Sequence, residues 1–189
     1  MFELILANFA RHVQLDASET AQLKIVLQQK TVKKHDFLLS QGKICRHIYF
    51  VNKGCLRTYY TDREGLQYNI SFCPENWWAV DIASFSRQQP AFYAIAALED
   101  TDVLYISFTE LEKLYTNIPK LERFFRILTQ NGFNLYQHRI TSGLSKTAEE
   151  RYRMFQKQYP GLEQRITQKQ VAAYLGITTV FLSRLRKRN

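Results

Sequence analysis

The sequence has few residues of the kinds that build metal centres and disulfide frameworks. Its three cysteines, Cys45, Cys55 and Cys73, are odd in number and form no CxxC pair, which argues against disulfides and zinc fingers. The four histidines are scattered singly, without the HxH pairing expected of a metal-binding roll. There is no Ser-His-Asp pattern and no glycine-rich phosphate loop. We therefore expect no metal site and no enzyme activity.

Long apolar stretches are also missing. No run reaches the roughly 18–20 residues needed to cross a bilayer. The N-terminal residues lack the basic start and the small-residue cleavage site of a signal peptide. We therefore expect a cytoplasmic protein without membrane contact. The hydrophobic fraction of 46% and the aromatic fraction of 14% indicate a folded chain with a substantial core.

Charge is distributed unevenly along the chain, whose overall net charge is +9. Residues 139–189 contain eleven lysines and arginines and three acidic residues, a net charge of +8, whereas residues 1–138 carry only +1. A near-neutral body with a strongly basic C-terminal end is typical of proteins that bind a polyanion. A solvated basic tail is the alternative, and charge alone does not decide between them.

The order of the predicted elements indicates an α+β fold. The first 30 residues read as helix, with a capping-box pattern at Asp16–Glu19. From about 32 to 107, short β-branched and aromatic segments are separated by turn signals at residues such as Gly42 and Gly54. Many short strands at this spacing predict a compact antiparallel β-roll. Thr109 is the expected cap of a short helix that follows the roll.

A long helix is predicted next, opened by Pro119, because proline is tolerated in the first turn of a helix. Its apolar residues fall at spacings of three and four and form a heptad-like seam. The seam consists of Leu121, Phe124, Phe125, Leu128, Gly132 and Leu135. We expect this seam to be a two-fold dimer interface. Packing of the same residues against the roll is the other interpretation.

The C-terminal segment has the spacing of a helix-turn-helix. Thr167–Gln170 is a capping-box pattern that opens a first helix. Ala172 is small where two helices would cross, Gly176 suits the left-handed turn residue, and Leu182 and Leu185 would seat a second helix on the first. An ordinary helix pair with a solvated basic face is the alternative. The coincidence of this spacing with the +8 segment favours a DNA-binding module.

The outer face of the second helix is polar and basic, which suits DNA. Arginine can bind guanine O6 and N7 with two hydrogen bonds, and hydroxyls near a helix start suit phosphate oxygens. The expected DNA-binding residues are Gln168, Thr178, Thr179, Ser183, Arg184, Arg186, Lys187 and Arg188.

These features resemble the Crp/Fnr family of bacterial regulators over nearly the whole chain. Ile48–Gly54 is similar to a turn of the family's cyclic-nucleotide-binding-type β-roll, and Tyr174–Thr178 with Leu182–Arg186 resembles its recognition element. By this resemblance, Arg184 corresponds to the family's guanine-reading arginine and Thr178 to the hydroxyl that caps the recognition helix.

The resemblance implies three parts. We expect a β-roll sensor domain with N-terminal helices over residues 1–118, a dimerisation helix over 119–143, and a helix-turn-helix domain over 144–189. The β-hairpin wing common in the family is not evident, since the sequence ends at Asn189. Its contacts to the DNA backbone would then have to be supplied in another way.

Two further departures concern the effector and the operator. Cyclic-nucleotide members carry Gly-Glu-Leu and Arg-Ser-Ala, where this chain has Val80–Ile82 and Ala91–Tyr93. Because the phosphate-holding arginine is replaced by Ala91, a buried phosphate would have little to offset its desolvation. Cyclic AMP is therefore not expected, and the roll binds another effector or none. The family's acidic base-reading residue is replaced by Val180, so the sequence preference should differ.

We therefore predict a homodimeric DNA-binding transcription regulator that reads a near-palindromic operator with helix 178–188. An unidentified effector in the roll would modulate it. The candidate effector pocket consists of Asp81, Ile82, Ala83, Phe92, Tyr93 and Tyr136. Candidate partners are double-stranded DNA, a second copy of the chain, a small-molecule effector and RNA polymerase. The alternative is a small-molecule-sensing roll that acts through protein partners, which the salt dependence of DNA binding would distinguish.

Overall fold

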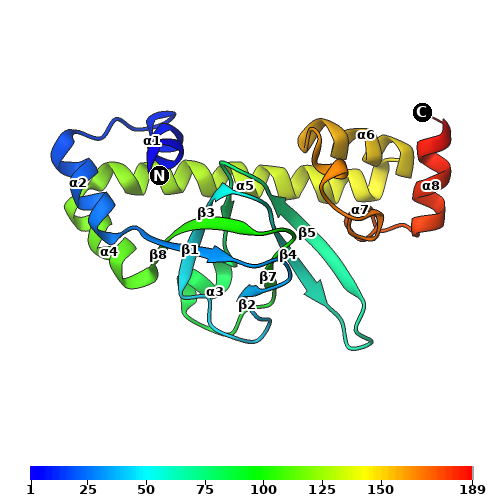
Figure 1. Cartoon of the computed structure of the whole chain (residues 1–189), viewed down its shortest axis with the longest axis horizontal. Coiled ribbons are helices and arrows are strands. Elements are labelled where there is room, and N and C mark those ends of the chain that lie inside the picture. Colours follow the sequence, from blue (N-terminus) through cyan, green and yellow to red (C-terminus); the bar gives the residue numbers. More distant parts are fainter. Residues whose placement is uncertain (189) are drawn as a thin grey trace.

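The computed structural model describes residues 1–188, with side chains through Lys187. An N-terminal helical pair leads into an antiparallel roll, and a long helix connects the roll to the C-terminal helices (Figure 1). The elements up to the end of the roll are α1 (Glu3–Ala10), α2 (Ala17–Val26), β1 (Gln28–Val32), β2 (Phe37–Leu39), β3 (His47–Lys53), β4 (Leu56–Thr61), β5 (Gln67–Cys73), β6 (Trp78–Ala79), α3 (Ile82–Arg87), β7 (Ala94–Ala97), β8 (Thr101–Ser107) and α4 (Phe108–Asn117).

The roll consists of two four-stranded antiparallel sheets with the orders β1-β8-β3-β6 and β2-β7-β4-β5. Gly54, between β3 and β4, has φ +94°, and a Cβ there would lie 2.6 Å from the Thr101 Oγ1 atom. Only glycine allows this close approach of the turn to the start of β8. The predicted roll of short strands is therefore confirmed. The glycine in the turn between β3 and β4 is required for a steric reason.

Two boundaries and two short elements differ from the sequence-based expectation. The end of the predicted N-terminal helix is instead β1, because Gln28–Val32 pairs along β8. The N-cap of α4 is Ser107 rather than Thr109, and its side chain accepts from the Glu110 N–H. The two-residue strand β6 and the short helix α3 were not predicted, since neither is long enough to show a period.

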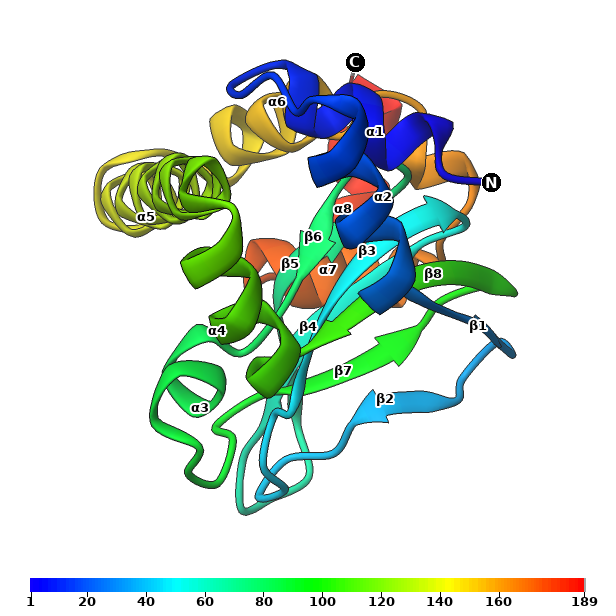
Figure 2. The same ribbon diagram turned by 90° about the vertical axis from the view of Figure 1, so that its left-hand side faces the viewer.

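Helix α5 (Pro119–Ser145) extends along most of the molecule, from the N-terminal helices and α4, past the roll, to the C-terminal helices (Figures 1 and 2). Leu121, Phe124 and Phe125 are buried within their own chain. Phe124 packs on Phe9, with ring centroids 4.3 Å apart, and Phe125 packs on Trp78 at 5.3 Å. For these three residues the predicted dimer seam is wrong, because packing against α1 and the roll already covers them.

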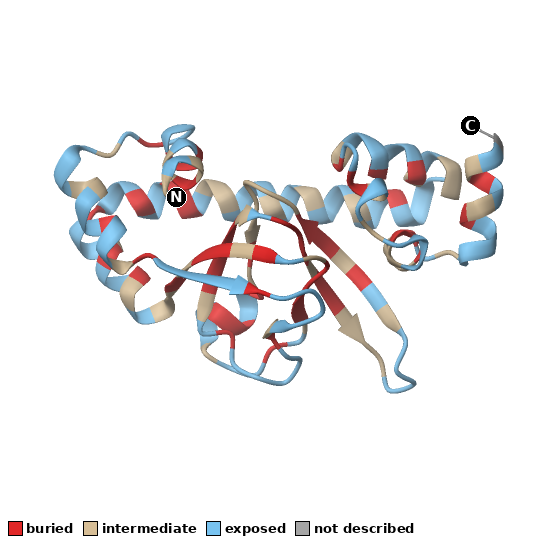
Figure 3. Ribbon diagram, viewed as in Figure 1, coloured by how far each residue is buried: buried red, intermediate tan, exposed pale blue. Residues whose placement is uncertain are grey.

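The rest of the predicted seam is half-buried, at Leu128, Gly132 and Leu135. A different face of α5 is apolar and open to solvent in the second half of the helix (Figure 3). Its largest side chains are Phe133, Ile140 and Leu144, which are 61%, 65% and 86% exposed. These residues recur at spacings of seven and four, so they form one stripe.

The C-terminal helices are α6 (Ala148–Gln158), the 3-10 turn η1 (Leu162–Gln164), α7 (Gln168–Leu175) and α8 (Thr179–Arg188). They share a buried cluster with the roll, since Phe72 of β5 lies edge-on to Phe155 and Tyr159, with centroids 6.1 and 5.6 Å away. The C-terminal unit therefore lies against the roll and is not held by α5 alone. Within the described residues, no helix has the length and apolarity needed to span a membrane.

Candidate nucleic-acid interface

Helices α7 and α8 meet at a sharp corner formed by Gly176. This residue has φ +66°, and its N–H donates to the Ala172 carbonyl, which ends α7 in the left-handed conformation that glycine adopts most easily. Two residues later the Thr178 hydroxyl accepts from the Phe181 N–H at 3.1 Å and caps α8. The turn and both caps therefore occur where the sequence predicted them.

The two helices are seated on each other by the expected apolar residues. Ala172 is 3% exposed and lies at the crossing, so the backbones can approach closely. The other buried contacts are made by Val171, Leu175, Leu182 and Leu185. Burial of this set fixes which side of α8 faces inward and leaves the opposite side free to meet a ligand.

Most of the predicted DNA-binding side chains lie on that outer side or next to it. Arg184 and Lys187 are exposed on α8, and the predicted contacts Gln168, Thr178 and Thr179 are also exposed. Ser183 is half-buried beside them. The side chain of Arg188 lies outside the described part of the structure.

Arg186 differs from the others, because its side chain is turned toward its own domain. Its Nε donates to the Tyr152 hydroxyl at 3.2 Å, and its Nη2 lies 3.5 Å from a Glu163 carboxylate oxygen. We interpret Arg186 as a brace between α8 and α6. Its predicted contact with DNA stays a prediction, and the contacts with Tyr152 and Glu163 disfavour it.

Two apolar residues on the outer face of α8 were not among the predicted DNA-binding residues, although Val180 corresponds to the family's base-reading position. Val180 is 61% exposed and Phe181 is 43% exposed, and both lie within one turn of Arg184. The signal was present, because a β-branched and an aromatic residue follow the helix cap directly. Apolar side chains here suit the methyl group that thymine presents in the major groove.

The α7 helix is fastened to strand β5 of the roll through Gln170. The buried Asn69 amide donates to the Gln170 side-chain oxygen at 2.7 Å and to its carbonyl at 2.8 Å. Arg57 donates to the same side-chain oxygen at 3.0 Å. The Thr167–Gln170 pattern is therefore only half of a capping box. Thr167 accepts from the Gln170 N–H at 3.4 Å, but the Gln170 side chain faces the roll.

A second connection is made by Arg139 of α5. Its guanidinium donates to the carbonyls of Asn69, Ile70 and Tyr174, and it also lies 3.8 Å from the centre of the Tyr174 ring. One cation thus joins the long helix, strand β5 and helix α7. The pose of the helix-turn-helix is set by these contacts.

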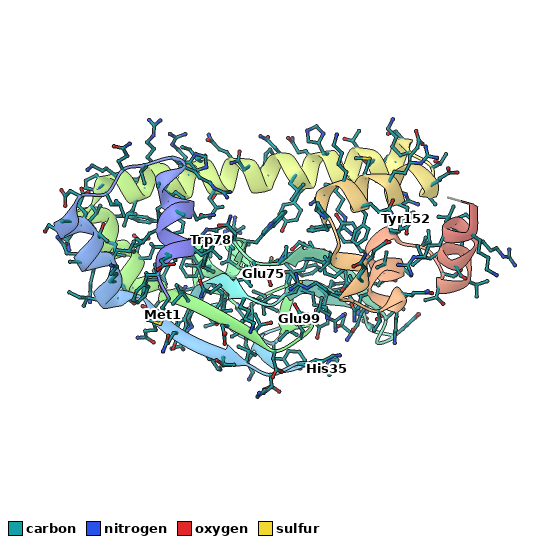
Figure 4. All side chains as sticks on the ribbon, turned by 45° about the horizontal axis from the view of Figure 1, so that its top comes forward. Met1, His35, Glu75, Trp78, Glu99 and Tyr152 are labelled. Carbon is teal, nitrogen blue, oxygen red and sulfur yellow. The ribbon has the colours of Figure 1, made fainter. Side chains whose placement is uncertain are left out.

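A third connection is the pair of ion contacts from Arg165 to Glu75 and Glu99. Arg165 binds the Glu75 carboxylate with two hydrogen bonds, at 2.8 and 2.9 Å, and also contacts Glu99. Figure 4 shows the two glutamates at the end of the roll that faces the C-terminal helices. Burial alone would raise the pKa of Glu75, but hydrogen bonds from Arg165 and from the Gly54 N–H outweigh it and leave that pKa below its usual value.

In the predicted effector pocket, Asp81 is buried and accepts three backbone hydrogen bonds. Its carboxylate accepts from Ser84 at 3.0 Å and from Phe92 and Tyr93 at 3.0 and 3.1 Å. Two of these donors belong to the stretch that matches the family's Arg-Ser-Ala. The chain's own carboxylate therefore occupies N–H groups that could otherwise face a ligand phosphate.

Most of the other predicted pocket residues are exposed. Ile82, Ala83 and Phe92 are exposed, and Phe92 stacks on Tyr60 with ring centres 4.7 Å apart. Tyr93 is half-buried, and Tyr136 is 39% exposed on α5. Two cavities elsewhere in the molecule are lined by other side chains. The effector pocket stays a prediction.

The three cysteines are buried thiols at separate points of the roll. Burial raises the pKa of Cys45 to about 11 and that of Cys73 to about 12, and it also raises the pKa of Cys55. These thiols are therefore protonated at neutral pH and unsuited to nucleophilic chemistry.

Comparisons with known proteins agree with this architecture. The cyclic nucleotide-binding domain family matches residues 29–117, which is the roll and α4. The fumarate and nitrate reduction regulatory protein of Vibrio cholerae is 28% identical over 187 residues, covering 90% of this chain and 72% of that protein. The anaerobic regulatory protein of Haemophilus influenzae is 29% identical over 184 residues, covering 90% and 70%.

Among solved structures, FixK2 from Bradyrhizobium japonicum superposes with a TM-score of 0.78 at 18% identity, covering 86% of this chain and 84% of that one. A regulator of the Crp/Fnr family from Eubacterium rectale gives 0.73 at 20% identity, covering 92% and 83%. A cyclic-nucleotide-binding-type roll joined by a long helix to a helix-turn-helix defines a DNA-binding transcription regulator. Over most of its length the chain is similar in sequence and fold to DNA-binding regulators of the Crp/Fnr type.

Proposed function

We propose that this regulator acts as a homodimer that inserts α8 of each copy into successive major grooves of a near-palindromic operator. Half-sites would lie about 34 Å apart, one turn of DNA. Such a protein works where bacterial DNA is, in the cytoplasm, and RNA polymerase is its expected partner. The three-part division of the chain at residues 118 and 143 also remains a proposal.

The observation that carries this proposal is the outer face of α8. Arg184 is exposed in its middle, the Gly176 corner and the Thr178 cap hold the helix, and the inner side is buried. The segment from residue 139 onward has a net charge of +8, which would favour approach to phosphates. An exposed arginine on a rigidly seated helix can reach guanine O6 and N7.

The test begins with selection of a preferred duplex from a randomised DNA pool by the full-length protein. Affinities for the selected and a scrambled duplex are then measured at two salt concentrations. Arg184→Ala should weaken binding to the selected duplex by about 1–3 kcal/mol while sparing most of the affinity for scrambled DNA. Arg63→Ala is the matched control, since it removes an exposed arginine from a turn of the roll.

Equal losses on both duplexes would show that Arg184 binds phosphate and does not read bases. Affinity that is weak and insensitive to salt would instead favour the alternative, in which the roll senses a small molecule and acts through protein partners. The face of α8 supports the DNA-binding reading, because its basic and apolar side chains lie together on one exposed surface.

The exposed stripe of α5 supports the homodimer. Phe133, Ile140 and Leu144 are large, apolar and open to solvent in the single chain. Pairing of α5 with its copy about a two-fold axis would bury the three side chains in a seam of helical spacing. The proposed interface is therefore in the second half of α5, on a different face from the predicted one.

An effector acting through the roll is part of the proposal, and its chemistry is restricted by Asp81. The N–H groups of Phe92 and Tyr93 already donate to the Asp81 carboxylate, and Ala91 stands where cyclic-nucleotide members have the arginine that holds the phosphate. A buried phosphate would therefore have little to offset its desolvation. Calorimetry with cyclic AMP should accordingly show no binding at micromolar concentrations.

A further inference from the structure

A cavity of about 280 Å³ lies where the roll, the long helix and the helix-turn-helix meet. Strand β5 contributes Ile70, α5 contributes Leu135 and Ser142, α6 contributes Met154, and α7 contributes Tyr174. The site is therefore built by all the units whose relative pose matters for DNA binding. It shares no residue with the predicted effector pocket around Asp81.

The charged residues lining this cavity are all of one sign. Arg139 comes from α5 and Arg151 from α6, and no acidic side chain is among the described lining residues. Arg139 donates to the backbone carbonyls of Asn69, Ile70 and Tyr174. These carbonyl oxygens do not neutralise the positive charge of the guanidinium, so the cavity attracts an anion.

Two polar atoms at the α6 side point to a missing acceptor. Arg151 Nε and Gln158 Nε2 are buried and have no hydrogen-bond partner among the described residues. They lie seven residues apart on α6, hence on the same side of the helix, and both residues line the cavity. Buried donors without an acceptor are rare in proteins and call for a specific partner.

We infer that this cavity is a binding site for a small anion with a phosphate or carboxylate group. Arg151 and Gln158 would donate to its oxygens, Arg139 would supply positive charge, and Leu135 and Met154 would cover an apolar part. The bound anion would fasten α6 and α7 to α5 and the roll. This regulatory consequence rests on the proposed DNA-binding function, whereas the binding site itself does not.

The binding test uses the full-length protein, with inorganic phosphate and succinate as separate probes at constant ionic strength. Calorimetry should show saturable binding of at least one probe, and the probe that binds tells a phosphate site from a carboxylate site. Arg151→Gln should weaken that binding by about tenfold or more, because a charge-assisted hydrogen bond is lost. Lys157→Gln, which removes an exposed charge from the same helix, should leave it unchanged.

Gln158→Glu keeps the test decisive should Arg151→Gln fail to fold. The new carboxylate would lie beside Arg151 and should abolish anion binding while the protein stays folded by circular dichroism. Absence of saturable binding of both probes would overturn the inference. Equal responses of the wild type and all three variants would overturn it too, since they would indicate a general ionic effect.

The regulatory consequence is tested on DNA in the same buffers. Saturation with the binding probe should change affinity for the selected duplex by at least about threefold in the wild type but not in Gln158→Glu. Unchanged wild-type affinity would refute the regulatory role and leave the site intact. Absence of DNA binding under every condition would instead contradict the proposed function.

Discussion

Arg184 and Val180 lie one helical turn apart on the exposed face of α8. Their side chains would recognise different chemical groups of a base pair. The arginine can donate two hydrogen bonds to guanine, whereas the valine can only pack against a methyl group. An acidic residue at the valine position would accept from cytosine. We therefore expect Val180 to favour thymine next to the guanine proposed as the target of Arg184.

We predict that replacing single thymines by deoxyuridine in the selected duplex weakens binding at the position under Val180. Loss of one methyl contact should cost about 1 kcal/mol, or roughly fivefold in affinity. Val180→Ala should abolish this sensitivity, whereas Thr179→Ala should preserve it. Uniform sensitivity to deoxyuridine in both variants would show that Val180 does not read the base.

The contacts of Asp81 could not be predicted from the sequence. The replacement of an arginine by Ala91 argued against cyclic AMP, but nothing in the sequence indicated that the Asp81 carboxylate would bind the N–H groups of Phe92 and Tyr93. Those bonds join residues eleven and twelve positions apart, across a short helix without a readable period. Contacts of this kind depend on tertiary structure.

Among the elements, the helix-turn-helix was the most predictable, because its signals are local. The Gly176 corner, the Thr178 cap and the seating of Leu182 are set by residues within one short segment. The seam of α5 was harder, since Phe124 is apolar whether it meets a second copy or the chain's own Phe9. Periodicity identifies an apolar face but not the surface that covers it.

The contacts between the C-terminal helices and the roll were likewise unpredictable, and the contact of Arg165 with Glu75 has consequences for pH. The folded pKa of Glu75 lies below its usual value, because hydrogen bonds from Arg165 and Gly54 outweigh the opposing effect of burial. The stabilisation from this pair is therefore complete above the ordinary glutamate pKa of about 4.3 and is lost as pH falls through the lower folded value.

We therefore predict that Arg165→Ala lowers the free energy of unfolding at neutral pH and flattens its fall on acidification below about pH 5. Urea unfolding followed by circular dichroism at a series of pH values measures both effects. Lys113→Ala, which removes a surface ion pair within α4, should leave the pH profile unchanged. Parallel profiles for wild type and Arg165→Ala would refute a linkage role for the Glu75 pair.

At the scale of the whole molecule, three sets of contacts hold the C-terminal helices, and with them α8, against the roll. Asn69 binds Gln170, Arg139 bridges three elements, and Arg165 binds Glu75. A second copy joined along α5 would place two such units about one axis, so their α8 helices would be related by the same symmetry. The spacing of the half-sites then follows from the dimer.

Ile140→Glu should convert the dimer to a monomer, because two carboxylates would meet in the apolar seam. Sedimentation velocity at micromolar concentration measures the change directly. Asn131→Glu, on a different exposed side of α5, should remain dimeric. Wild-type protein that sediments as a monomer, or an Ile140→Glu variant that stays dimeric, would exclude this face as the interface.

The most direct test of the central claim is protection of the selected duplex from methylation by dimethyl sulfate. An α8 helix in each major groove should protect guanine N7 in two patches one helical turn, about 10–10.5 base pairs, apart, and leave adenine N3 in the minor groove reactive. Arg184→Ala should lose the guanine protection. Protection confined to adenine N3, or no N7 protection under saturating protein, would contradict insertion of α8 into the major groove.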